Sequence, residues 1–489
     1  MTSQTATATA GSHLDARRLE VPIALTLAVL AVVAALLVRT YPNYDSYYHL
    51  VWGRDLLHGI KPGFKTYAAP TEHPLYIALC ALLSLLGQDA DRALVIVCVL
   101  SLVALVWAVY RVGEAVFGAW PGLAAALFVG SSFAFLLYAA RAYVDVPFLA
   151  VVLWAAAIEA RRPRAGTPVM ALLAVAGVLR PEAWVLAGAY WLWIGPFGRP
   201  RSARLDLLAL AVAAPVIWCL VDLAVTGDPL FSLHATSDLA DELNRSRGVG
   251  ALPGAFVSFL TDTARAPVAA AGVLGIVLAW RLRVGRALHV PIALFGAGVV
   301  TFLATGIAGL SVLPRYLTVP VVALCLFAGY GALGFTTLPR GSSLRRGWGA
   351  AAAVLAVFGL VFVAVKAPVV HKLTAELRFI RTSHDDLVSI LHAPRVERGL
   401  RCGPLTFPTY RLVPDSRWML DLPARRVGAR SAKRRTRGVA IFVLTPKGLS
   451  RFGFAQGTSP TVNVPDPGFV PIARNRSYAA YASCGTGAA

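Results

Sequence analysis

Asp45 is the residue whose type and position most directly indicate chemistry. It lies in the segment YPNYDSYYHLVWGRDLLHG, directly after a long apolar run, so we expect its carboxylate at the level of the lipid headgroups. A carboxylate in that position can act as a general base. The same pattern fits a helix N-cap, because the Asp precedes a helical segment. Its aromatic neighbours, Tyr48 among them, also fit an interfacial belt. The roles are not exclusive, and all stay open.

A second polar group follows in the sequence TEHPLY. Glu72 and His73, with His49 and His58 of the preceding segment, supply carboxylate and imidazole groups of the kind that bind metal ions. No pair of them has the spacing of a diagnostic ligand motif such as HExxH. The sequence therefore identifies no ion, and metal ligation stays an open alternative.

Two further motifs place charges beside apolar segments. RAYVDVP contains Arg141 and Asp145. Arg141 fits a lipid-snorkelling side chain and Asp145 a helix cap, but the pattern also allows Asp145 and Asp45 to converge on one external cavity. Arg180 and Glu182 lie between two short apolar segments. A charge at mid-bilayer costs about 2.5–3.5 kcal/mol, so we expect these two to face a cavity or to pair with each other.

LPRYLTVP places Arg315 and Tyr316 at the start of a late apolar run. The planar guanidinium of arginine donates several hydrogen bonds at once, which suits it to phosphate. An Arg-Tyr pair at a membrane interface can equally anchor a helix. The motif is therefore a candidate phosphate site with a structural alternative.

The elements that must position these residues are membrane helices. Hydrophobic residues make up 57% of the 489 residues and charged residues only 15%, which excludes a disordered or wholly soluble chain. About 20 apolar residues cross a bilayer. Apolar runs predict about eleven membrane helices, near 21–39, 92–110, 119–139, 147–159, 168–179, 183–196, 205–225, 267–280, 288–309, 317–337 and 349–366. A shorter apolar stretch, 74–86, predicts an interfacial helix.

Charge sets the expected orientation. The chain carries 46 Lys and Arg against 25 Asp and Glu, a net charge of +21, and many of these cations lie in short loops between apolar runs. The positive-inside rule then places the loops that hold Arg111, Arg161 and Arg281 in the cytoplasm. The predicted division is a cytoplasmic tail 1–19, a membrane module 20–366 with an external loop 40–91, and an external soluble domain 367–489. Nucleic-acid binding is not expected.

The segment 367–489 is predicted to be a small α+β domain. It contains a helical pattern at 373–393 and a strand-like GVAIFVLTP. Cys402 and Cys484 are candidates for one disulfide if the domain lies in an oxidising compartment. Its basic stretch, ARRVGARSAKRRTRG, suits either an anionic glycan or lipid surface or an ordinary solvated face.

Taken in order, these motifs resemble the GT-C glycosyltransferases. The resemblance consists of an acidic residue after the first span, an EHPLY segment, R-x-Y-x-D-x-P in the second external loop and a late RYLTVP, over roughly residues 20–340. Members such as protein O-mannosyltransferases, the lipid A aminoarabinose transferase and mycobacterial arabinosyltransferases are polytopic enzymes. They use polyprenyl-phosphate-linked sugars on the non-cytoplasmic face.

The resemblance implies a hexosyl- or pentosyltransferase that moves sugar from a polyprenyl monophosphate to a hydroxyl of a cell-envelope glycan, lipid or protein, with inversion. Asp45 would be the base, and Asp145 the acidic residue of the second loop. We expect the donor phosphate and substrate to be bound by a wider set: Arg315, Tyr316, Arg141, Arg180, Glu72, His73, Tyr48 and His49. No cofactor is expected to be required, with a divalent cation as the alternative. A transporter or lipid flippase, or a noncatalytic assembly scaffold, are competing functions, although no internal repeat supports a transporter.

Overall fold

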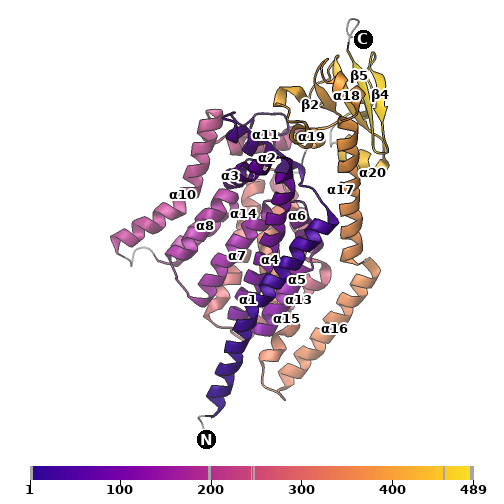
Figure 1. Ribbon diagram of the computed structural model, residues 1–489. Coiled ribbons are helices and arrows are strands. Elements are labelled where there is room, and N and C mark those ends of the chain that lie inside the picture. Colours follow the sequence, from indigo (N-terminus) through magenta and orange to yellow (C-terminus); the bar gives the residue numbers. More distant parts are fainter. Residues whose placement is uncertain are drawn as a thin grey trace.

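The computed structural model describes residues 4–195, 200–243, 245, 248–366, 368–454 and 458–484. The first three residues of the predicted cytoplasmic tail lie outside these ranges. The described chain is mostly helical, with a bundle of long apolar helices and a small C-terminal sheet at one end of it (Figure 1).

The bundle is formed by helices that follow the predicted apolar runs. Its helices are α1 (Gln4–Val38), α4 (Ala90–Phe117), α5 (Ala119–Gly130), α6 (Phe133–Ala140), α7 (Asp145–Arg161), α8 (Thr167–Leu179), α9 (Glu182–Trp193), α10 (Arg201–Thr226), α13 (Ala266–Arg281), α14 (His289–Ile307), α15 (Thr318–Leu333) and α16 (Ser343–Lys366). Shorter helices at the sheet end are α2 (Tyr44–Leu57), α3 (Pro74–Leu83), α11 (Phe231–Glu242) and α12 (Leu252–Ala264).

Each of the eleven predicted spans is helical, but fewer are long enough to cross a bilayer alone. Within the described residues, six helices have the required length and apolar character, or up to eight if each of two bent pairs counts as one span. The bends lie between α5 and α6 (57°) and between α12 and α13 (102°). The predicted interfacial helix begins at Pro74, as expected, and ends as α3 at Leu83.

The loops sort to the two ends of the bundle as the charge pattern predicted. Arg111 pairs with Glu20, and Arg161 pairs with Glu114, so segments predicted to be cytoplasmic meet at one end. The predicted external loops meet at the other end, where the sheet lies (Figure 1). Which side of the membrane each end faces stays a prediction.

The C-terminal region begins with α17 (Val369–Leu391), which rises from α16 toward the sheet (Figure 1). Its amphipathic sequence packs on the sheet through Leu387, Ile390 and Leu391, all buried. The remaining elements are α18 (Pro394–Gly399), β1 (Leu405–Phe407), α19 (Val413–Leu420), β2 (Val427–Ala429), β3 (Gly438–Val443), α20 (Pro446–Gly448), β4 (Val470–Arg474) and β5 (Tyr478–Ser483). The predicted helix and strand are both present.

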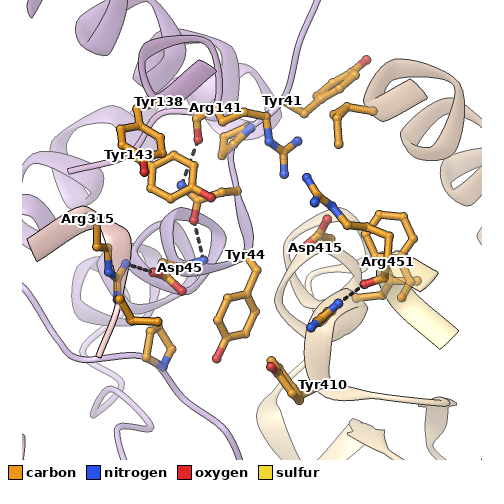
Figure 2. A pocket seen from close by; sticks show the side chains of 18 of the residues that line it. Tyr41, Tyr44, Asp45, Tyr138, Arg141, Tyr143, Arg315, Tyr410, Asp415 and Arg451 are labelled. Carbon is orange, nitrogen blue, oxygen red and sulfur yellow. Dashed lines mark hydrogen bonds and ion pairs between the residues drawn. The ribbon is translucent and has the colours of Figure 1, made fainter. Parts of the chain in front are cut away.

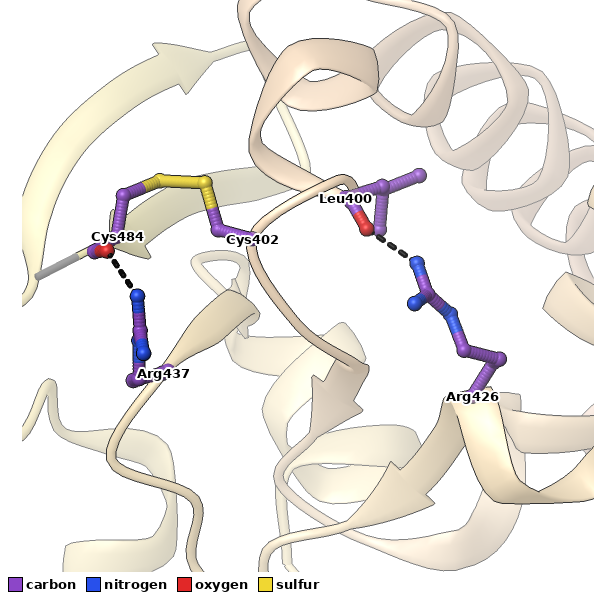
Figure 3. Close-up of a disulfide and its surroundings, with 5 residues drawn as sticks. All are labelled: Leu400, Cys402, Arg426, Arg437 and Cys484. Atoms are coloured by element: carbon purple, nitrogen blue, oxygen red, sulfur yellow. Dashed lines mark hydrogen bonds between the residues drawn. A yellow bond between two sulfur atoms is a disulfide. The ribbon is translucent and has the colours of Figure 1, made fainter. Parts of the chain in front are cut away.

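The sheet is mixed, in the order β2-β1-β3-β5-β4. Strand β1 runs parallel to β2 and β3, whereas β5 is antiparallel to β3 and β4. Cys402 and Cys484 form a disulfide beside it, with Cα atoms 5.1 Å apart (Figure 3). Arg437 donates a hydrogen bond to the Cys484 carbonyl next to this bond. The disulfide that the spacing left open is therefore present, and it ties the start of the sheet region to the end of β5.

Candidate active site

A cavity of about 410 Å³ lies between the membrane helices and the C-terminal region. Its lining residues come mainly from four segments between the membrane helices, within 40–91, 140–146, 226–266 and 310–316, and from the tail. Figure 2 shows Asp45, Arg141 and Arg315 on the side of the membrane helices, facing Tyr410, Asp415 and Arg451 of the tail. Five arginines and two aspartates line it: Arg141, Arg245, Arg315, Arg411, Arg451, Asp45 and Asp415. This excess of cations suits an anionic ligand.

Helix α2 presents Asp45 to the cavity. The N-cap is Asn43, whose side-chain oxygen accepts hydrogen bonds from the backbone N–H groups of Asp45 (2.8 Å) and Ser46 (3.3 Å). The capping role that the sequence allowed for Asp45 therefore belongs to Asn43. Asp45 instead lies in the first helical turn, where the positive end of the helix dipole favours a carboxylate.

The Asp45 carboxylate forms an ion pair with Arg315. Arg315 Nη1 donates to Asp45 Oδ2 at 2.7 Å, across 270 residues of sequence. The side chains are 20% and 19% exposed, so the pair is open to the cavity. Asp45 Oδ1 has no hydrogen-bond partner within the described residues. One carboxylate oxygen thus remains available to a ligand.

A strained turn holds Arg141 at the cavity. The Arg141 carbonyl accepts hydrogen bonds from the backbone N–H (2.8 Å) and the side-chain amide (2.9 Å) of Asn43. The next carbonyl, of Ala142, accepts from the hydroxyls of Ser46 (2.5 Å) and Tyr76 (2.6 Å). Ala142 has φ of 53°, a left-handed conformation that costs a non-glycine residue about 1–3 kcal/mol. These hydrogen bonds join the segment before α2 to the turn between α6 and α7. Burial also lowers the pKa of Arg141.

Asp145 does not line this cavity, although the sequence allowed it to share one with Asp45. It is fully buried and forms an ion pair with Arg180, which also binds Glu182 through Nε (3.0 Å). The Arg180–Glu182 pair expected as a structural alternative is thus present, with Asp145 as its third member. The Tyr316 ring lies between the two clusters, 5.7 Å from the Arg180 guanidinium carbon and 6.0 Å from that of Arg315.

Four other candidate residues lie behind the cavity wall. The rings of His49 and His73 stack, with centroids 5.2 Å apart, and burial lowers the pKa of both, that of His49 to about 4. Both are therefore neutral at pH 7 and supply no cation to a phosphate. Tyr48 is buried against Trp52.

Glu72 is the fourth residue behind the wall and belongs to a buried acidic cluster. It accepts a hydrogen bond from Ser232 (2.9 Å), whose hydroxyl also contacts Asp222. Burial, and then the neighbouring Asp222, raise the pKa of Glu72. Among the residues that the structure describes, no three His, Cys, Asp or Glu side chains gather to hold a metal ion.

The sequence did not indicate the cavity residues of the tail. Asp415 lies in the first turn of α19, is half-buried and has one carboxylate oxygen without a partner. Burial raises its pKa to about 7. Tyr410 packs edge-on against Tyr44 of α2. The basic stretch 424–438 does not line the cavity. Its Arg430 and Arg434 both bind Asp466 within the tail. Only contacts across more than 300 residues reveal the tail's contribution, and no local pattern encodes them.

Arg54 of α2 fixes the tail over the cavity. Its guanidinium donates to the carbonyls of Arg417 and Trp418, both at 3.2 Å, pairs with Asp421 at 3.1 Å and lies 5.0 Å from the Trp418 ring centroid. Helix α2 reaches this position because it packs closely on α3. A Cβ atom at Gly53 would lie 2.5 Å from the backbone nitrogen of Ala81. The helix that carries Asp45 therefore also anchors the opposite wall.

Residues 70–221 match the model of the family described as dolichyl-phosphate-mannose-protein mannosyltransferase. No curated protein matches the chain in sequence. The crystal structure of ArnT from Cupriavidus metallidurans in the apo state is similar to this chain with a TM-score of 0.51 and 15% identity, over 96% of this chain and 98% of that one.

A second similar structure is the oligosaccharyltransferase of Archaeoglobus fulgidus, tethered with an acceptor peptide containing the NVT sequon. Its TM-score is 0.45 at 13% identity, over 83% of this chain and 63% of that one. The ArnT similarity extends over nearly all of both chains, whereas the family match runs only from the segment before α3 into α10. The family match over residues 70–221, with an ArnT-like fold over nearly the whole chain, supports a multi-pass membrane glycosyltransferase of the GT-C type.

Proposed function

We propose that the protein transfers a hexosyl or pentosyl group from a polyprenyl monophosphate to a hydroxyl of a cell-envelope glycan, lipid or protein. In this proposal the N-terminus is cytoplasmic, and the cavity and the domain 367–489 are on the outer face. The observation that carries it is the Asp45–Arg315 ion pair, which joins a carboxylate and a guanidinium at the wall of a cationic cavity. Reaction at a sugar phosphate requires both a base and a cation.

The proposed reaction is a direct displacement at the anomeric carbon. The acceptor oxygen forms a bond to that carbon, its proton passes to Asp45, and the bond to the phosphate oxygen breaks. The departing polyprenyl phosphate keeps the electron pair, and inversion follows from attack on the opposite face. Arg315 faces the charge that develops on the phosphate, where preorganised donors contribute most. Arg141, held by the strained turn, is the second cation proposed for this role.

The ion pair also suggests how the base becomes available. Without donor, Arg315 occupies one oxygen of Asp45. A donor phosphate presents bidentate acceptors to the same guanidinium and competes with the carboxylate for it. Asp45 is then free to accept the acceptor proton. In this scheme donor binding precedes activation of the acceptor, and Asp145, Arg180, Glu72, His73, Tyr48 and His49 position the site from behind its wall.

A donor panel tests the proposal. Purified full-length protein in nanodiscs is incubated with polyprenyl-phosphate hexoses and pentoses and an envelope lipid extract as acceptor, and release of polyprenyl phosphate is measured. Asp45→Asn should lower turnover about 100- to 10,000-fold, the usual contribution of a positioned acid or base. Asp89→Asn, exposed at the end of the short 3-10 helix before α4, is the matched control and should keep normal turnover.

Two results would contradict the proposal. Near-normal transfer by Asp45→Asn would remove the base assignment. Absence of release from every donor, by wild-type protein that unfolds at its normal temperature, would remove the polyprenyl-phosphate donor class.

A further inference from the structure

A second large cavity lies away from the candidate active site, on the membrane-facing side of the bundle. It is an apolar groove of about 710 Å³ between α16 and the helices α5, α13 and α15. We call it the α16 groove. Apolar side chains from all these helices form its walls, among them Phe128, Pro267, Val268, Val321, Cys325, Leu355 and Phe362. It shares no lining residue with the cavity around Asp45.

The groove exists because α16 packs on the bundle only near its N-terminal end. There Trp348 is 3% exposed, donates a hydrogen bond to the Gly331 carbonyl (2.8 Å) and packs against Tyr330. Farther along, small residues face the bundle. Gly359 is one of them; it lacks a side chain, and an added Cβ there would only come into ordinary contact with Pro267, at 3.9 Å. Figure 1 shows α16 standing apart from its neighbours.

Polar and cationic groups gather at one end of this groove, where three helix junctions meet. The α5–α6 break contributes Ser132, whose buried hydroxyl has no hydrogen-bond partner. The α12–α13 break contributes Arg265, which has a left-handed φ of 67°. Lys366 and Lys372 come from the end of α16 and the start of α17.

These three cations have no acidic partner within the described part of the chain. The acidic residues nearest in sequence are Asp262 and Glu376. Glu376 already binds Lys447 and Arg451 on the tail, and Asp262 forms no ion pair among the described residues. The end of the groove therefore presents uncompensated positive charge above an apolar slot.

We propose that the α16 groove is a binding site for an anionic phospholipid of the surrounding bilayer. The acyl chains lie along α16, and the headgroup phosphate is held by Arg265, Lys366 and Lys372. The lining of α16 runs from Gly349 to Lys366, about 26 Å at 1.5 Å per residue, against a hydrocarbon core about 30 Å thick. The cations thus lie at the level of one headgroup layer, where each attracts anionic lipid. This site does not depend on the proposed transferase activity.

Lipid retention measured by native mass spectrometry tests the site. The full-length protein is released from nanodiscs that contain equal amounts of phosphatidylglycerol and phosphatidylcholine. Wild-type protein should retain phosphatidylglycerol preferentially. Replacing the three cations with glutamine (R265Q, K366Q, K372Q) should lower that preference roughly tenfold or more. A triple variant of arginines in the tail, R395Q, R398Q and R435Q, is the charge-matched control and should keep the preference.

A second pair of variants tests the groove itself. Ala356→Trp fills the slot and should abolish retention of phosphatidylglycerol. Val354→Trp lies on the same helix, does not line the groove and is 69% exposed, so it should retain the lipid. Equal retention by the two tryptophan variants, or equal retention of both lipids by the wild type, would overturn the proposal. The proposal would also be overturned if the lipid retained by the wild type were displaced by polyprenyl phosphate but not by added phosphatidylglycerol. That result would assign the groove to polyprenyl phosphate.

Discussion

Two carboxylate–arginine clusters lie on either side of the Tyr316 ring and differ mainly in burial. In the pair of Asp45 and Arg315, both side chains are about one-fifth exposed and face a cavity. In the cluster of Asp145, Arg180 and Glu182, the side chains are 0%, 4% and 10% exposed. A buried charge without a partner is costly, whereas a partly hydrated pair exchanges partners cheaply. The same residue types therefore suit a reactive site in one place and a structural joint in the other.

The sharpest way to break this comparison is to remove each arginine in turn. Arg180→Ala leaves two buried carboxylates without a cation and should destabilise the protein by about 3–5 kcal/mol. Arg315→Ala should cost no more than about 1 kcal/mol, because water reaches Asp45. Thermal unfolding in one detergent measures both. Equal losses would show that exposure does not separate the clusters.

Conservative changes at Arg315 sharpen the functional side of the comparison. Arg315→Gln should lower kcat/KM for the lipid-linked donor roughly 10- to 150-fold, equivalent to about 1.5–3 kcal/mol for a charged hydrogen bond. Arg315→Lys keeps the charge but lacks the planar fork, so its activity should be intermediate. The assay is release of polyprenyl phosphate at varied donor concentration. Activity of the Gln variant at the wild-type level would separate Arg315 from the donor phosphate.

Asp415 is an intermediate case, and its expected effect is the smallest. Burial raises its pKa to about 7 from an ordinary value of 3.8, so the folded protein binds the proton more tightly than the unfolded chain does. Its contribution to stability is complete below about pH 4 and is lost as the pH rises through about 7. Asp415→Asn should therefore flatten the dependence of the unfolding temperature on pH between about pH 4 and 7. Parallel curves for variant and wild type would show that Asp415 is hydrated in both states.

The sequence predicted the helices well because hydropathy is a local property. Each of the apolar runs is helical, although 119–139 is divided into α5 and α6, and the charge pattern grouped the loops correctly at the two ends. The sequence also identified Asp45 as a candidate base and Arg315 as a candidate phosphate ligand. No local sequence pattern indicates that these two side chains, 270 residues apart, form an ion pair.

Burial and long-range contact limited the rest of the prediction. RAYVDVP gave Asp145 the same weight as Asp45, because sequence does not reveal that Arg180 closes over it. Asp415 and Tyr410 lie in a region whose residues reach the cavity only through tertiary packing. The basic stretch of the tail is prominent in composition, yet its Arg430 binds Asp466 and the backbone carbonyls of Val462 and Val464.

The contacts of Arg54 with the tail also bear on the timing of synthesis. Arg54 binds the carbonyl of a residue 363 positions later in the chain. At about 5–20 residues per second, a ribosome needs about 20–70 s to make that stretch. During this interval α2 and its Asp45 are already present, but the opposite wall of the cavity is not. The nascent protein therefore inserts its first helices long before the cavity around Asp45 is complete. A chain released early would hold the proposed base without an enclosed site.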